Sequence, residues 1–424
     1  MSVVFENVRV FDGASDHVFG PVNVLVSGST IDEISPPAAQ PPPPANGDKR
    51  TVIAGGGRVL MPGLIDAHAH ISLSSIPLQA MLTADLGDLA VHGSLAATAM
   101  LMRGFTTVRD AGGPVFSIKR AIDQGLVPGP RIYPSGAFIS QTSGHGDFRM
   151  PYEVPRGICG HLSHTEIEGA ATIADGADEV LRAAREQLMR GASQIKMMAG
   201  GGVSSFYDPI DVTEYTEAEL RAGVEAAENW GTYVLVHAYT PRAIQQALRA
   251  GVRSIEHGHL ADEATAAMIA EKGAWWSLQP FLDDEDANPM HDPRSRQKQL
   301  LVNAGTDTAY ELARKHSIKL AWGTDTLFDA KLNRRQGAQL AKLARWFTPA
   351  ETLRMATSGN AALLALSGER NPYPGPLGVV EPGALADLLL VNGNPLDDLS
   401  LVATPETSFA VIMKDGVVHR NLLS

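Results

Sequence analysis

The sequence predicts an α/β protein, a (β/α)8 TIM barrel with a small β-sandwich domain built from both ends of the chain. Three observations lead to this prediction: short strand patterns fill the first sixty residues, strand–loop–helix units follow, and strands return near the C-terminus. Eight alternating units favour a closed barrel over a doubly wound sheet. We expect the barrel to span residues 62–372 and the β-domain to combine residues 1–61 with 373–424.

The N-terminal part shows alternating apolar residues separated by Gly and Asp turns, which is typical of short strands. The predicted strands are 3–5, 8–11, 22–26 and 30–34. The stretch 35–48 follows them and contains four consecutive prolines. Because proline suits neither a core strand nor a helix interior, we expect a surface loop there.

The middle of the chain contains eight short apolar runs that predict buried parallel strands. They are 64–68, 105–110, 131–135, 193–198, 232–237, 252–256, 274–278 and 318–322. The helices between them have recognisable ends, such as the capping box of Thr216 and Glu219 and the start at Thr348-Pro349. Gly191 and Gly251 stand where helices commonly terminate.

The C-terminal part predicts strands at 386–391 and 410–414. Asp415-Gly416 then predicts a tight hairpin turn into a strand that begins with Val417. Strands at both ends, with α/β units between them, indicate one β-domain assembled from the two termini.

Composition limits the classes of partner. The net charge of −12 argues against binding to nucleic acid or to an anionic membrane surface. One cysteine, Cys159, excludes an internal disulfide framework and fits a reducing, cytoplasmic location. No signal peptide is visible at the N-terminus, although a chain from which a signal had been removed would look the same. No apolar run approaches the ~20 residues of a membrane helix.

Residues capable of binding metal stand at the ends of the predicted strands. The set is His68, His70, Lys196, His237, His257 and Asp325. His68 and His70 are two positions apart on one strand, so both side chains point to the same face. Each residue alone has a common structural explanation, but their order and placement indicate one metal site at the mouth of a barrel.

The motifs around these residues resemble those of the amidohydrolase superfamily over essentially the whole chain. They are DAHAH, TTVRDAGG, QIKMMAGGG, VHAY, SIEHG, WGTD and the tail GVVEPGALADLLLVNGNPL. Within that superfamily, SGHGD, GGGVSSFYDPID and His237-Ala238-Tyr239 resemble the branch of Xaa-Pro dipeptidase-like carboxypeptidases and ochratoxin-degrading amidohydrolases.

The resemblance implies a dinuclear centre in which Lys196, carboxylated by CO2, bridges two divalent metal ions, with Zn2+ favoured. His68, His70, Lys196 and Asp325 would hold one ion, and Lys196, His237 and His257 the other. The chemistry agrees, because a lysine cation would be repelled from two metals whereas its carbamate is an anion with two oxygens. Two such ions lower the pKa of a bridging water and supply hydroxide. Asp325 would accept the proton of the attacking water and protonate the leaving nitrogen.

The same resemblance suggests the substrate. Relatives of this branch cleave an amide bond next to a C-terminal amino acid with a free carboxylate, so we expect an N-acyl amino acid or dipeptide, with ochratoxin A as a candidate. His145 and Tyr239 are candidates for binding substrate oxygen atoms, and for a catalytic part in doing so, while Leu327 and Phe328 would supply apolar contact. The segment 138–170 is a candidate lid, within which His164 is a candidate substrate contact and His161 a surface residue. His259 is expected to lie behind the ligands or in a loop.

Two alternatives remain open from the sequence. One is a cyclic amidase such as imidazolonepropionase, which shares similar strand motifs but lacks the bridging lysine. The other is a catalytically inactive barrel used as a scaffold, although such scaffolds usually lose metal ligands. The resemblance also implies a homo-oligomer, with an octamer as one expectation.

Overall fold

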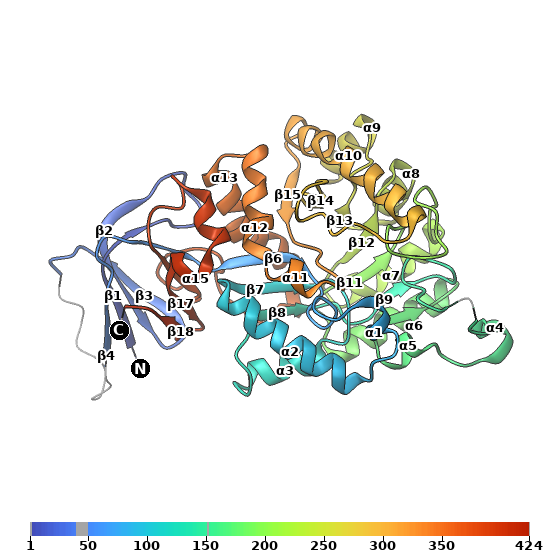
Figure 1. Ribbon diagram of the computed structural model, residues 1–424, viewed down its shortest axis with the longest axis horizontal. Coiled ribbons are helices and arrows are strands. Elements are labelled where there is room, and N and C mark those ends of the chain that lie inside the picture. Colours follow the sequence, from blue (N-terminus) through green and yellow to red (C-terminus); the bar gives the residue numbers. More distant parts are fainter. Residues whose placement is uncertain (1, 40–49, 151, 424) are drawn as a thin grey trace.

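The β-domain is built from strands at both ends of the chain, as Figure 1 shows for this computed structural model of residues 2–39, 50–150 and 152–423. Its strands are β1 (Ser2–Val10), β2 (Phe19–Ser27), β3 (Thr30–Ser35), β4 (Arg50–Ala54), β5 (Val59–Pro62), β16 (Leu388–Val391), β17 (Phe409–Lys414) and β18 (Val417–Asn421). The two runs predicted as strands before residue 12 form one strand, β1, with an irregularity near Asn7, whose φ is 53°. Most of the proline-rich stretch 35–48 lies outside the described residues.

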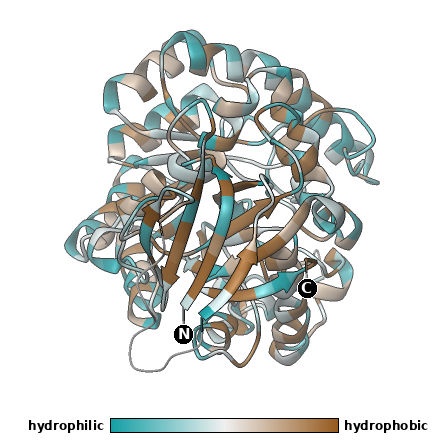
Figure 2. Ribbon diagram, turned by 90° about the vertical axis from the view of Figure 1, so that its left-hand side faces the viewer, coloured by the Kyte–Doolittle hydropathy of each residue, from teal (hydrophilic) through white to brown (hydrophobic). Residues whose placement is uncertain are grey.

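These strands join into one sheet in the order β18-β17-β16-β5-β1-β2-β3, with β4 also pairing with β1. The sheet folds over on itself, because Thr30 at the start of β3 forms a bridge with Leu385 just before β16. The predicted sandwich is thus one continuous sheet wrapped around its own apolar core, which includes Phe5, Ile31 and Leu390. Figure 2 views this domain from the front and shows apolar residues concentrated along its strands.

The eight predicted barrel strands are all present. They are β6 (Leu64–Ala69), β7 (Phe105–Asp110), β8 (Arg131–Pro134), β11 (Ile195–Met198), β12 (Val234–Ala238), β13 (Ser254–His257), β14 (Trp275–Leu278) and β15 (Lys319–Trp322). All their pairings are parallel. Backbone hydrogen bonds join the two ends of the strand series, since Asp325 N donates to His68 O at 2.8 Å.

Two short strands were not predicted. β9 (Phe138–Ser140) lies beside β11, and β10 (Ala171–Ile173) extends the sheet outward from β9. Together β8 and β9 occupy the third barrel position, and Ser193 N donates to Pro134 O across the gap at 2.8 Å. The chain between β9 and β10 leaves the barrel as an arm that carries α4, visible at the right of Figure 1.

Helices surround the barrel. They are α1 (Leu78–Met81), α2 (Leu86–Met102), α3 (Phe116–Asp123), α4 (Arg156–Cys159), α5 (His164–Ile167), α6 (Ala177–Arg190), α7 (Glu217–Asn229), α8 (Pro241–Ala250), α9 (Glu263–Lys272), α10 (Pro293–Lys315), α11 (Ala330–Asn333), α12 (Gln336–Ala341), α13 (Pro349–Arg354) and α14 (Asn360–Leu364), with α15 (Pro405–Ser408) near the β-domain. The predicted capping box at Thr216 and the predicted helix start at Thr348-Pro349 are confirmed, as are the left-handed caps at Gly191 and Gly251. Within the described part of the chain, no helix has the length and apolar character of a membrane span.

The β-domain packs on the barrel through one face of its sheet. Phe409 and Leu389 belong to the same apolar cluster as the barrel helices. Gly104 allows this approach, since a Cβ there would lie 2.5 Å from the Phe409 ring. At the start of β8, Arg131 donates to Asp387 at 2.8 Å and to Asp415 at 2.7 Å. Because Arg131 and Asp387 are both buried, the contact is a buried ion pair between the two parts of the molecule.

A candidate metal centre at the barrel mouth

A cavity of about 160 Å³ lies at the carboxyl ends of the barrel strands. It is lined by all six residues predicted as metal ligands: His68, His70, Lys196, His237, His257 and Asp325. They come from β6 and the residue just after it, from β11, β12 and β13, and from the segment after β15, so the ends of five strands converge there. The sequence predicted one shared site because each of these residues stands at a strand end, and the structure brings all six to one cavity.

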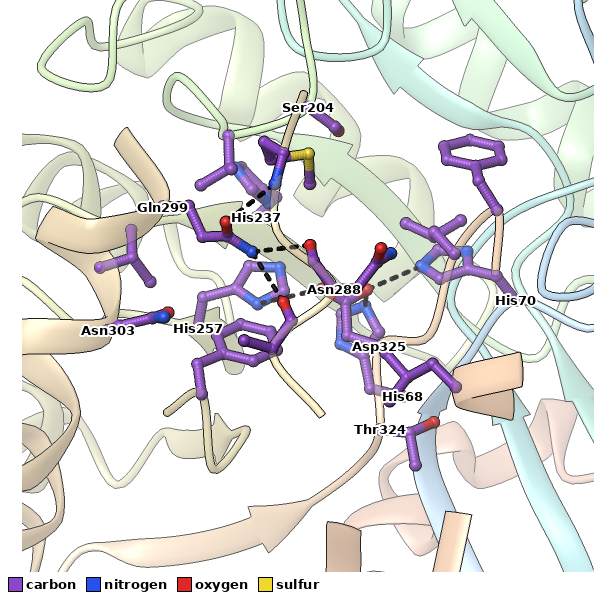
Figure 3. A pocket seen from close by; sticks show the side chains of 18 of the residues that line it. His68, His70, Ser204, His237, His257, Asn288, Gln299, Asn303, Thr324 and Asp325 are labelled. Carbon is purple, nitrogen blue, oxygen red and sulfur yellow. Dashed lines mark hydrogen bonds and ion pairs between the residues drawn. The ribbon is translucent and has the colours of Figure 1, made fainter. Parts of the chain in front are cut away.

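The four histidine rings are arranged side by side around the cavity. The ring centroids of His70 and His68 are 5.2 Å apart, those of His68 and His257 are 5.0 Å apart, and those of His257 and His237 are 4.6 Å apart. Figure 3 shows these rings together with Asp325, which lies between His70 and His257. The four imidazole rings therefore line one side of the cavity, where their nitrogen atoms are available as metal ligands.

Asp325 reaches across this space. Its Oδ1 is 3.3 Å from Nε2 of both His68 and His70, and its Oδ2 is 3.8 Å from Nδ1 of His257. Asp325 and His257 both have positive φ values, 50° and 69°, a conformation that is rare for residues other than glycine. Ligand atoms of His68, His257 and Asp325 all lie within 4.8 Å of one another, close enough to share one metal ion.

Each histidine uses one nitrogen in a hydrogen bond that orients its ring. The bonds are His68 Nδ1 to Glu256 Oε2 (2.7 Å), His70 Nδ1 to Gly112 O (2.9 Å), His257 Nδ1 to Gln279 Oε1 (2.7 Å) and His237 Nε2 to Gly201 O (3.2 Å). Because all four partners are acceptors, the bonded nitrogen carries the hydrogen and the other nitrogen keeps its lone pair. This is the usual arrangement of metal-binding histidines.

Burial favours the neutral, metal-binding form of these rings. Loss of solvation, together with neighbouring cationic groups, holds the pKa of His237 and of His257 well below the usual range. His68 differs: burial lowers its pKa, but the carboxylates of Asp325 and Glu256 outweigh this effect and raise it. The same carboxylates would favour a divalent cation at that position.

Lys196 is buried at the end of β11 and lines the cavity. Its Nζ forms neither a hydrogen bond nor an ion pair with any residue that the structure describes. Burial lowers its pKa to about 8, despite the opposing carboxylates of Glu256 and Asp325. An appreciable fraction of the amine is therefore neutral near pH 7, as reaction with CO2 requires.

The donor set fits divalent metal ions. Lone-pair nitrogens, a carboxylate and an amine that can be carboxylated suit Zn2+ and similar ions. The buried Nε2 of His68 has no hydrogen-bond partner among the described residues and faces the Asp325 carboxylate at 3.3 Å, so its lone pair fits a metal ligand.

The two residues predicted to bind substrate oxygens line the same cavity. The ring of His145 stacks on His237 at 4.0 Å, and its Nδ1 lies 2.7 Å from Ser205 Oγ and 3.4 Å from Asp208 Oδ2. Gly202 permits this position, because a Cβ there would lie 1.9 Å from the His145 ring. Tyr239 packs against His237 and His257, at 5.0 and 5.2 Å between ring centroids.

Apolar side chains form the outer wall of the cavity. Leu327 and Phe328 follow Asp325, and the Phe328 ring meets Phe148 edge-on at 6.4 Å. The loop between β14 and α10 adds further apolar residues, Phe281, Leu282 and Met290. This side of the cavity therefore suits a large apolar group.

The structure does not bring His164 to the cavity, so its assignment as a substrate contact is corrected. His164 begins α5, and its Nε2 is bonded to Ala84 O at 2.7 Å, which ties α5 to the segment before α2. His161 is exposed, in the arm. His259 is buried behind the site and bonds to Gln279 O at 2.9 Å.

Several residues around the site were missed by the sequence analysis. Glu256 orients His68, and Arg109 bonds to Glu256. Both are charged residues inside predicted strands whose other members are mostly uncharged, and that signal could have found them, although not their pairing. Lys298 of α10 was also missed. Its Nζ donates hydrogen bonds to three backbone carbonyls of the loop that contains Ser205.

Comparison with known proteins agrees with this site. The model of the amidohydrolase family matches residues 59–422. Ochratoxinase from Aspergillus niger is 32% identical over 369 residues, covering 82% of this chain and 73% of that protein. Its crystal structure superposes with a TM-score of 0.85 at 26% identity, covering 100% of this chain and 96% of that one.

Two solved structures extend the comparison. A prolidase complexed with N-methylphosphonate-L-proline is 35% identical, with a TM-score of 0.88 and coverage of 99% of this chain and 100% of that one. A Xaa-Pro dipeptidase with methionine in its active site is 26% identical, with a TM-score of 0.83 and the same coverage. The family is metal-dependent and hydrolyses amide bonds. From the extent of the match and the residues gathered at the barrel mouth, we conclude that this chain belongs to the amidohydrolase family.

Proposed function

We propose that this enzyme is a dinuclear metal-dependent amidohydrolase that cleaves the amide bond of an N-acyl amino acid or dipeptide with a free carboxylate. Ochratoxin A, which would yield ochratoxin alpha and phenylalanine, is one candidate substrate. The observation that carries the proposal is Lys196, a buried amine with no hydrogen-bonding partner among the described residues, in a cavity that it lines together with four histidines and an aspartate. The similarity to ochratoxinase and to the prolidase supports the substrate class.

The proposed roles of the ligands follow their positions. His68, His70 and Asp325 would hold one ion and His237 and His257 the other, with carboxylated Lys196 between them. Zn2+ is the proposed metal, because imidazole and carboxylate donors suit it. Two such ions would lower the pKa of a water molecule and polarise the substrate carbonyl.

The other side chains would bind substrate and move protons. Asp325 would accept a proton from water and deliver it to the leaving nitrogen, a role that its position within 3.8 Å of three candidate metal ligands supports. His145 and Tyr239 would bind the substrate's oxygen atoms, since both line the cavity beside His237. Leu327 would contact an apolar group of the substrate.

The assembly and location are also proposals. We propose a cytoplasmic homo-oligomer, for which an octamer is one expectation. Exposed apolar residues support association: Val91 and Leu95 on α2 and Ile158 on the arm are each more than half exposed. Light scattering coupled to size exclusion would measure the mass, and a monomer at micromolar concentration would contradict this proposal.

The dinuclear centre is tested with Lys196→Ala. Removing the bridging group should lower the metal content from two ions per chain and abolish most activity, and small carboxylates such as formate should restore part of it. Elemental analysis and activity assays measure both effects. Lys315→Ala, which removes an exposed lysine outside the ligand set, is the matched control for metal content and activity. Two ions and full activity in Lys196→Ala would refute the bridge.

Recognition of the carboxylate is tested with a matched pair of substrates, an N-acyl-phenylalanine and its C-terminal amide. A site built to bind an anion leaves its own polar groups unpaired when the anion is missing, so kcat/KM should fall on the order of a hundredfold for the amide. Equal turnover of the pair would contradict carboxylate recognition. Preferential turnover of a cyclic amide would instead assign the enzyme to the cyclic amidases.

A further inference from the structure

A buried arginine and a buried glutamate lie next to each other inside the barrel, among the strands that carry the candidate ligands. Arg109 of β7 donates from Nη2 to Glu256 Oε2 of β13 at 2.7 Å, and both side chains are 0% exposed. Ser254 Oγ donates to the other oxygen of Glu256 at 2.5 Å. The carboxylate is thus fully bonded and charge-balanced, as a buried charge must be.

Glu256 also bonds to a candidate metal ligand. Its Oε2, the same oxygen that accepts from Arg109, lies 2.7 Å from His68 Nδ1. The other three histidines of the cluster, which all lie in the described part of the chain, bond to a neutral carbonyl or amide oxygen. His68 therefore differs from them in that the acceptor of the hydrogen bond that orients its ring is a carboxylate, and such a carboxylate makes the opposite nitrogen of the ring a stronger donor to a metal.

Arg109 holds the strand of His68 as well as the carboxylate. Its Nε donates to Ala67 O at 2.5 Å, and Ala67 directly precedes His68 on β6. Its Nη1 donates to Tyr233 OH at 3.2 Å. One guanidinium thus fixes the backbone beside the imidazole and the oxygen that the imidazole contacts, and its planar fork suits this double contact.

We infer that Glu256 and Arg109 are positioning residues for the metal site, which set the tautomer and orientation of His68 and thereby the affinity for the metal ion that His68 binds. This inference rests on the proposed metal centre. It assigns a function to a pair that otherwise would only fill the barrel interior.

A double-mutant cycle separates the two roles. Arg109→Met and Glu256→Leu each leave one buried charge without its partner, so each should lower the Tm of the metal-free protein. The double variant removes both charges and should recover most of that Tm. Its affinity for Zn2+, measured by competition with a chromogenic chelator, should nevertheless stay about 10- to 100-fold below wild type, because His68 still lacks its carboxylate. Recovery of the affinity together with the Tm would overturn the inference.

Controls make each outcome decisive. The buried pair Arg131 and Asp387 joins the barrel to the β-domain at the start of β8, so Arg131→Met/Asp387→Leu is a matched double variant that should keep wild-type affinity. Glu256→Gln retains a neutral acceptor and serves if the double variant does not fold; it should bind Zn2+ about tenfold more weakly, and unchanged affinity would overturn the inference. Wild-type protein that binds no Zn2+ would instead refute the proposed function itself.

Discussion

Glu214 lies in the loop after β11, where its Oε1 accepts a hydrogen bond from the backbone N of His145 at 2.8 Å. Its side chain is fully buried, and its Oε2 has no hydrogen-bond partner among the described residues. Burial, with the neighbouring carboxylate of Asp208, raises the pKa of Glu214 to about 9. At neutral pH this residue is therefore an uncharged acid beside the proposed substrate-binding histidine.

This pKa predicts a pH-dependent stability. Between its unfolded pKa near 4.5 and its folded pKa of about 9, the folded state binds a proton that the unfolded state has released. The contribution of Glu214 to stability is therefore complete at low pH and is lost as pH rises toward 9. Glu214→Gln cannot titrate, so its Tm relative to wild type should rise between pH 5 and pH 8.5. The exposed Glu186→Gln should show no such trend, and parallel curves for Glu214→Gln and wild type would contradict the assignment.

At the level of residues, the sequence predicted that the candidate ligands share one site, but the residues that hydrogen-bond to them were missed. His68, His70, Lys196, His237 and His257 stand at or near strand ends, and that placement is visible in the sequence. The residue that hydrogen-bonds to a candidate ligand could not be predicted in this way. Glu256 is separated from His68 by 188 positions, and their contact depends on barrel closure. His164 is the opposite case, since it was predicted as a substrate contact in the candidate lid, but its ring bonds to Ala84 O and does not line the cavity.

Among the elements, α10 supports the loop that positions His145. Lys298 of this helix donates to the carbonyls of Gly202 and Asp208 at 2.9 and 2.7 Å, and to that of Ser205 at 3.3 Å. Ser205 and Asp208 both face His145 Nδ1. A side chain outside the cavity thus fixes the loop that orients a side chain inside it.

Lys298→Met should disturb this loop while the barrel stays folded. Three carbonyls lose a charged donor, and small displacements in an active site reduce activity strongly, so kcat/KM should fall about ten- to hundredfold. Steady-state kinetics and Tm together check the prediction. Lys315→Met, at the exposed end of the same helix, should change neither. A fall in Tm with unchanged kcat/KM would show that Lys298 supports only the fold.

Elements with a strong local signal were predicted, and those formed by distant pairing were not. The eight barrel strands are apolar runs, and each lies within a few residues of its predicted position. β9 and β10 are each three residues long. β9 pairs with both β10 and β11, and these distant pairings rather than a sequence pattern define the two strands. The domain boundaries at 61/62 and 372/373 stay a prediction.

At the scale of the whole molecule, Arg131 links the β-domain and the barrel in addition to their apolar contact. It bonds to Asp387 and Asp415 from the start of β8, and Arg131 and Asp387 are only 5% and 3% exposed. An ion pair of this kind costs little when complete, but it becomes unfavourable when one partner is removed.

Arg131→Met should therefore destabilise the molecule by about 3–5 kcal/mol, because Asp387 would stay buried without its cation. Chemical denaturation and Tm measure the change. Arg182→Met removes an exposed arginine whose partner lies 3.9 Å away, and it should cost less than about 1 kcal/mol. Equal effects of the two substitutions would show that the interface does not depend on the pair.

The pairing of β5 with β16 also bears on how the chain is made. β5 ends at Pro62 and leads through Gly63 into β6, whereas β16 begins only at Leu388. At roughly 5–20 residues per second, a ribosome needs on the order of tens of seconds to produce the strand that covers β5. During that interval the unpaired edge of β5 is open to other chains, which is a known route to aggregation. Interrupted synthesis of this enzyme should therefore yield insoluble fragments even when the whole barrel has already emerged.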